Sequence, residues 1–105
     1  MTNVCLTTAD GEVRLCDRAI TLISGHAVAT LDDASDLLGY MAPREIPLHD
    51  VPPKTPSSFV VDTWEGLLTV CLFGDDLLVG NRGRVYRRPL SEVVDMRRME
   101  EAWDE

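Results

Sequence analysis

Polar and apolar residues alternate along the first third of the chain, with the period of two that is typical of half-buried β-strands. Asp10-Gly11 divides this region early, and both residues tolerate the positive φ that a tight hairpin turn requires. Gly25 divides it again, either as a turn between two strands or as a bulge within one strand. The first third is therefore predicted to be a β-meander. Its predicted strands cover residues 3–7, 12–16, 19–24 and 26–30.

A short helix is predicted directly after this meander. Thr30 can cap it, and Asp32 and Asp33 lie where the positive end of a helix dipole favours negative charge. Gly39 is predicted to end the helix. The residues predicted to face the core are Ala34, Leu37 and Leu38.

The segment from Pro43 to Pro56 holds five of the six prolines. Because proline lacks an N–H group and has a fixed φ, this segment can form neither a helix nor a central strand. We predict a long, stiff loop. A packed structural crossover is the favoured interpretation, and a contact surface is the alternative.

A second β region follows, in which four apolar segments are separated by short turns that contain glycine. This pattern predicts three successive antiparallel hairpins. The second segment is almost continuously apolar, which is typical of a central strand covered on both faces. The four segments are residues 59–63, 67–73, 77–79 and 84–88.

The last segment is predicted to be an amphipathic helix, because apolar residues recur at intervals of three and four. Ser91 is its predicted cap. Acidic residues crowd its C-terminal end, where the dipole disfavours them. A solvated acidic tail is the favoured interpretation, and a last turn that frays or meets a basic partner is the alternative. The apolar positions are Val93, Met96, Met99 and Trp103.

Together these elements predict an α+β domain that covers residues 1–105. Its antiparallel sheet has about six or seven strands and is bent or split in two. The order of elements is a β-meander, a short helix, the proline-rich loop and a second β-meander, with a C-terminal amphipathic helix packed on one face. The hydrophobic content of 45% and the charged content of 27% are close to those of globular proteins.

The cellular location of the protein is predicted from the absence of two sequence features, a membrane span and a secretory signal. No stretch approaches the roughly 20 apolar residues of a membrane span. The N-terminus lacks the basic and then apolar pattern of a secretory signal, so we expect a cytoplasmic protein without a membrane partner. Cys5, Cys16 and Cys71 form no CxxC pair, and we interpret them as small buried residues of a reducing compartment.

The net charge of −8 is unevenly distributed along the chain. Residues 1–80 carry 12 acids and 4 bases, residues 81–88 carry four arginines, and residues 89–105 carry 6 acids and 2 bases. Such an acidic chain disfavours generic nucleic-acid binding. The alternative interpretation of the basic island is that it holds phosphates and stacks a base, as a dimer that doubles the basic surface; internal ion pairing is the favoured interpretation. Its residues are Arg82, Arg84, Tyr86, Arg87 and Arg88.

A cluster of carboxylates around the short helix and the proline loop is the predicted partner-binding surface. Such a surface can bind a basic groove, including one that normally holds DNA, by imitating its charge pattern. Its residues are Asp32, Asp33, Asp36, Glu45 and Asp50.

Candidate catalytic chemistry is sparse. Asp75 and Asp76, in a Gly-Asp-Asp turn, together with Asp62, are of the residue type that binds two metal ions in nucleic-acid polymerases, but an ordinary hairpin turn explains them as well. His26 and His49 lie in no recognisable nucleophile motif. We therefore predict no catalytic residues, no metal and no cofactor.

Two short segments have a family resemblance. Residues 30–39 are similar to the opening of excisionase-type winged-helix DNA readers, and residues 45–48 look like the segment that follows their recognition helix. The five residues between them, which include Pro43, are too few for a recognition helix. The resemblance therefore implies no function for this chain.

The sequence favours a non-enzymatic protein-binding module. We expect a small acidic regulator, inhibitor or accessory subunit that docks on a larger protein, of the kind encoded by phages and mobile elements. Residues 30–50 and the C-terminal helix are the expected contact surfaces. The alternative is a small nucleic-acid-binding regulator that uses the hairpin from Arg82 to Arg88.

Overall fold

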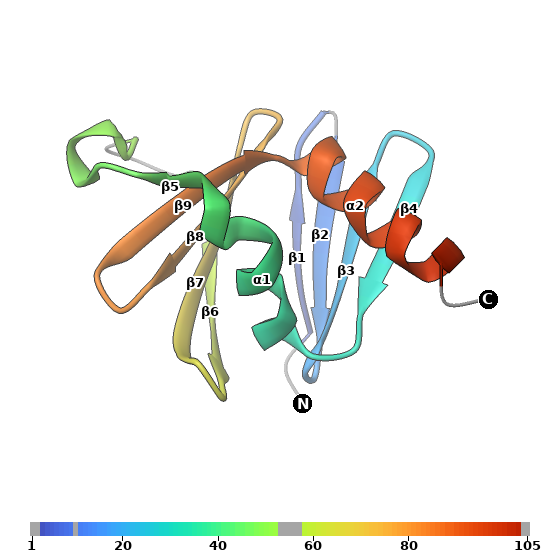
Figure 1. Ribbon diagram of the computed structural model, residues 1–105, viewed down its shortest axis with the longest axis horizontal. Coiled ribbons are helices and arrows are strands. Elements are labelled where there is room, and N and C mark those ends of the chain that lie inside the picture. Colours follow the sequence, from blue (N-terminus) through green and yellow to red (C-terminus); the bar gives the residue numbers. More distant parts are fainter. Residues whose placement is uncertain (1–2, 10, 53–57, 104–105) are drawn as a thin grey trace.

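A computed structural model describes residues 3–9, 11–52 and 58–103 and has an α+β fold (Figure 1). The described strands form two antiparallel sheets, of four and five strands, with helices on one side of the molecule. The α+β class is therefore confirmed, and the described strands form two separate sheets, the split one of the two expected arrangements. The expected count of about six or seven strands is too low, because the described residues form nine.

The first sheet is a meander in the order β1-β2-β3-β4. Gly25 has a φ of 61° and lies in the turn between β3 and β4, so it separates two strands and makes no bulge. Asp10, part of the predicted first turn, lies outside the described residues. The strands are β1 (Asn3–Thr7), β2 (Gly11–Cys16), β3 (Ala19–Ser24) and β4 (Ala27–Leu31).

The second sheet has the order β5-β9-β8-β7-β6, and its last four strands are the three predicted hairpins. In β7 the consecutive residues 70–72 are all buried, as expected of a strand covered on both faces. The strands are β5 (Glu45–Ile46), β6 (Ser58–Thr63), β7 (Gly66–Phe73), β8 (Asp76–Asn81) and β9 (Arg84–Pro89).

Strand β5 explains how the proline-rich segment fits the fold. It pairs only with β9, at the edge of the sheet, where a neighbouring proline breaks no ladder of hydrogen bonds. A 3₁₀ turn lies on each side of it, η2 (Ala42–Arg44) and η3 (Leu48–Asp50). Residues 53–57 of the predicted loop lie outside the described residues.

The short helix begins with a 3₁₀ turn, η1 (Ala34–Asp36), which continues as α1 (Leu37–Met41). Its cap is Asp33, whose carboxylate accepts the Ser35 N–H at 3.0 Å, so the predicted Thr30 cap is wrong. Gly39 lies inside α1, so it does not end the helix as predicted.

The C-terminal helix α2 (Leu90–Trp103) packs on β3 and β4 of the first sheet. It begins at Leu90, whose N–H donates to the Asp75 carbonyl at 2.9 Å, so the predicted Ser91 cap lies inside the helix. This bond fixes the start of α2 to the turn between β7 and β8.

One apolar core joins the inner faces of both sheets and the two helices. Alternate residues of β2, β3 and β6 point into it, as the alternating pattern predicts. The helix α2 covers β3 and β4 of the first sheet, and β1 contacts β7 of the second sheet. The fully buried members of the core include Ile20 and Leu22 of β3, Leu68 and Val70 of β7, and Val93 of α2.

Arg88 connects three elements at one edge of this core and is only 9% exposed. Its guanidinium donates to the Tyr40 carbonyl, in the last turn of α1, at 2.8 Å. It also donates to the Glu92 carboxylate of α2 at 2.9 Å and 3.1 Å. A buried arginine therefore caps α1 and holds it beside the first turn of α2.

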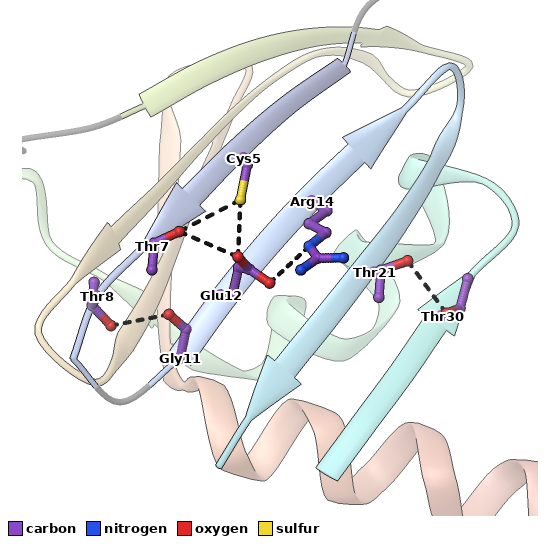
Figure 2. A network of polar contacts seen from close by, with 8 residues as sticks. All are labelled: Cys5, Thr7, Thr8, Gly11, Glu12, Arg14, Thr21 and Thr30. Carbon is purple, nitrogen blue, oxygen red and sulfur yellow. Dashed lines mark hydrogen bonds and ion pairs between the residues drawn. The ribbon is translucent and has the colours of Figure 1, made fainter. Parts of the chain in front are cut away.

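The outer face of the first sheet is polar (Figure 2). Cys5 and Cys16 are exposed there and only Cys71 is buried, so the prediction of three buried cysteines is wrong for two of them. The Cys5 thiol lies 3.1 Å from the Glu12 carboxylate, which also pairs with Arg14 at 2.7 Å. The hydrogen bond from Cys5, followed by the hydrogen bond and the charge of Arg14, lowers the pKa of Glu12.

The Asp33 cap predicts a pH dependence of stability. The hydrogen bond from Ser35 lowers the pKa of Asp33 below its ordinary value of 3.8. Since the folded pKa lies below the unfolded one, the charge of Asp33 stabilises the fold at neutral pH, and this contribution is lost as the pH falls through the folded value. Asp33→Asn keeps a capping oxygen without the charge. The difference in unfolding free energy between the wild type and this variant, measured by urea titration, should therefore shrink towards acid pH; a constant difference would contradict the assignment.

Candidate functional site

A groove of about 660 Å³ lies between α1 and α2. Leu31, Leu38 and Met96 form its apolar part. Both helices lie on the same side of the molecule, and α2 crosses in front of the first sheet (Figure 1). The groove is therefore built by the capped short helix, the end of β4 and the second half of α2.

Hydrogen bonds fix the polar part of this groove. The buried Tyr40 hydroxyl donates to the Glu100 carboxylate, and Arg97 lies 3.7 Å from the same carboxylate. Burial, followed by the bond to Glu100, raises the pKa of Tyr40, so its hydroxyl keeps its proton at neutral pH. Arg97 Nε also donates to the Thr30 carbonyl on β4 at 3.2 Å. The second half of α2 is thus held to both α1 and β4.

The groove continues along α2 into a second hollow of about 530 Å³. The two hollows share Met96 and Glu100, so they form one continuous surface. Met99 is 62% exposed and Trp103 is 84% exposed on it. Large apolar side chains grouped beside a groove are typical of a binding surface, whereas isolated ones are not.

Carboxylates border this surface. Asp36, Glu65 and Glu100 line the first hollow and come from η1, the turn between β6 and β7, and α2. Arg97 is the one cation that lines it among the described residues, and it also pairs with Glu101 at 3.4 Å. The groove therefore combines an apolar floor with an acidic border.

Gly39 lines the groove from the middle of α1. A glycine inside a helix is destabilising by about 0.5–1 kcal/mol relative to alanine. Its φ is not positive, and an added Cβ would meet nothing within 4 Å, so neither backbone conformation nor packing requires glycine here. Its missing side chain leaves this wall of the groove open.

The structure does not bring all five predicted acidic residues together. Asp32, Asp33 and Asp36 lie on the segment that leads into α1, and Asp36 alone lines the groove. Glu45 lies in β5, and Asp50 lies beyond it in η3. Each of these two has a basic neighbour of its own: Glu45 lies 3.9 Å from Arg84, and Asp50 lies 3.4 Å from the His49 imidazole.

Three of the four arginines in the predicted basic hairpin have carboxylate partners. Arg84 lies 3.9 Å from Glu45, Arg87 lies 2.7 Å from Asp76, and Arg88 is the buried connector described above.

The remaining two members of this hairpin differ in exposure. Arg82 is exposed in the turn between β8 and β9, with a φ of 51°. Tyr86 is only 8% exposed, so its ring faces the core and offers no free face to a base. Nucleic-acid binding by the hairpin stays a prediction, and its base-stacking element lacks an accessible ring.

The register of β7 separates the carboxylates of the metal hypothesis. Asp62 pairs with Leu67 near one end of β7, whereas Asp76 pairs with Phe73 at the other end. Six residues of strand correspond to about 20 Å, so Asp62 cannot share one ion with Asp75 and Asp76. Among the residues that the structure describes, no three His, Cys, Asp or Glu side chains lie together as a metal site.

Sequence reasoning missed the groove, although it identified most of its parts. Met96, Met99 and Trp103 were predicted to share one apolar face of the last helix, and Leu38 was predicted to face the core. The sequence signal for the groove lies in the 14-residue helix α2, whose apolar positions continue into an acidic C-terminal turn. An apolar stripe that continues into an acidic last turn indicates a helix that runs beyond the core.

Comparison with known proteins gives no matching family model and no significant match among curated proteins or solved structures. In the described part of the chain, no helix has the length and apolar character needed to span a membrane. Functional inference therefore rests on the geometry of this chain.

Proposed function

We propose that this chain is a non-enzymatic protein-binding module, a small acidic regulator, inhibitor or accessory subunit that docks on a larger protein. The observation that carries the proposal is the grouping of Met99 and Trp103, both largely exposed, beside the groove between α1 and α2. Trp is among the residues that contribute most to binding energy at protein interfaces. An acidic border next to such a surface adds orientation and faster association with a basic partner.

Capture of a partner from a nuclease-treated lysate of the encoding organism tests this function. The wild-type chain should retain a protein in a stoichiometric amount at moderate salt, read by mass spectrometry. Met99→Ser/Trp103→Ser should lose it, with at least about a tenfold fall in affinity for a central aromatic anchor. Asp32→Lys/Asp36→Lys tests the acidic surface and leaves the Asp33 cap intact.

Melting temperatures of the two variants serve as the control. Trp103 and Met99 are exposed, so their replacement should leave the melting temperature nearly unchanged. A bait that retains no protein, or one that retains the same protein after both pairs of substitutions, would overturn the proposal. Recovery of nucleic acid alone, when nuclease is omitted, would instead favour the arginine hairpin.

A further inference from the structure

The apolar floor of the groove and its acidic border point to one class of partner. We infer that the groove between α1 and α2, extended over Met99 and Trp103, binds an amphipathic helix whose apolar face is flanked by lysine and arginine. This inference rests on the proposed function and specifies the partner's chemistry.

The apolar residues of α2 beside the groove match in length the contact that a short helix makes. Met96, Met99 and Trp103 follow one another at i, i+3 and i+7 along α2. They span about 10 Å, or two helical turns. A partner helix can pack its own apolar residues, at the same spacing, between this ridge and Leu38 of α1. The two methionines can adapt to side chains of different shape, as flexible thioethers do at binding surfaces.

An added strand is a poorer fit than a helix at this place. The groove meets the first sheet at the end of β4, which is an edge strand. There the Thr30 carbonyl already accepts from Arg97 Nε at 3.2 Å. An extended peptide that pairs with β4 would therefore have to displace that bond. A helix has no such need, because its main-chain N–H and C=O groups form hydrogen bonds within the helix itself.

Charge selects a basic partner. Asp36, Glu65 and Glu100 face the groove, against Arg97, which is already paired with Glu100 and Glu101. The negative end of the α2 dipole lies beside Trp103, so acids there are unfavourable in the free chain and favourable next to a cation.

The same charges argue against a second copy of this chain as the occupant. A symmetric pair of α2 helices would bring Glu100 and Glu101 of both copies together on a chain whose net charge is already −8. Like charges opposed across an interface are strongly unfavourable. The partner is therefore a different, basic chain.

A designed peptide tests the inference directly. The probe is an 18-residue helix with leucine at a repeat of three and four and lysine elsewhere, used at physiological salt. Two matched peptides isolate its features: one has glutamate in place of lysine, and one has the same composition with the leucines rearranged so that they share no helical face. In a Trp64→Phe background, Trp103 is the only tryptophan. Its emission should shift to the blue and saturate as the basic helix covers it, while either matched peptide should bind at least about tenfold more weakly.

Two variants of the chain separate groove binding from general attraction between a basic peptide and an acidic protein. Met99→Ser/Trp103→Ser keeps every charge, so it should weaken binding at least about tenfold by peptide anisotropy only if the apolar floor is the site. Gly39→Arg places a long cation on the wall of the groove, at a position where an added Cβ meets nothing within 4 Å. It should weaken binding while keeping or raising the melting temperature.

Equal binding of the peptide by the wild type and the Met99→Ser/Trp103→Ser variant would overturn the inference. Equal binding of the lysine and glutamate peptides, or no binding of any peptide, would do the same. If the lysate partner is still captured through Met99 and Trp103 in that event, the proposed function stands and only the basic-helix partner is excluded.

Discussion

Arg88→Ala is expected to destabilise the fold by about 2–3 kcal/mol. The substitution leaves the buried Tyr40 carbonyl without its donor and removes two bonds to the Glu92 carboxylate. A buried polar group left unpaired costs about 1–3 kcal/mol, and hydrogen bonds to charged groups are worth about 1.5–3 kcal/mol. Because 41% of the Glu92 side chain is exposed, water replaces part of what its carboxylate loses. In a thermal melt the midpoint should fall by about 10 °C.

Arg84→Ala is the matched control for this prediction. It removes the same side chain from the same strand, but Arg84 is 68% exposed at the side chain and lies 3.9 Å from Glu45. An exposed pair of that geometry contributes about 0–1 kcal/mol. If the two alanine variants melted at the same temperature, Arg88 would be an ordinary surface arginine and the link between α1 and α2 would have to lie elsewhere.

The second β-meander was predictable almost residue by residue from local pattern. Its turns contain glycine, and three of these glycines, Gly66, Gly74 and Gly83, have the positive φ that such turns favour. Strand β5 was not predictable, because two residues among prolines carry no periodic signal. Its existence depends on pairing with β9, which is distant in sequence and sets the edge of the sheet.

The division into two sheets also lies beyond local pattern. Alternation specifies which residues of each strand face a core, but it does not specify whether consecutive meanders join edge to edge or pack face to face. Arg88 illustrates the same limit for the site. Its place in the alternation matches that of Arg84, yet one guanidinium is buried against Tyr40 and the other is exposed. The positions of α1 and α2, which strand alternation does not specify, determine which arginine is buried and links them.

Leu22→Ala in the first sheet is expected to destabilise the second sheet as well. Leu22 is fully buried in the core that both sheets share. Removing it should lower the unfolding free energy by about 3 kcal/mol, the usual cost of a Leu→Ala cavity. If the two sheets unfold as one unit, amide hydrogens of β8, at the centre of the second sheet, should exchange roughly 100-fold faster at native conditions.

Leu67→Ala is the control for this prediction, because it removes the same atoms from β7 at a position that is 62% exposed. It should change stability by less than about 1 kcal/mol and leave the exchange in β8 nearly unaltered. Amide exchange accelerated in β8 as much as in β3 after Leu22→Ala is the signature of one cooperative domain, since both sheets contribute side chains to one core. Acceleration confined to the first sheet would mean that the two meanders fold as separate units, with Arg88 and the groove lying at a joint between them.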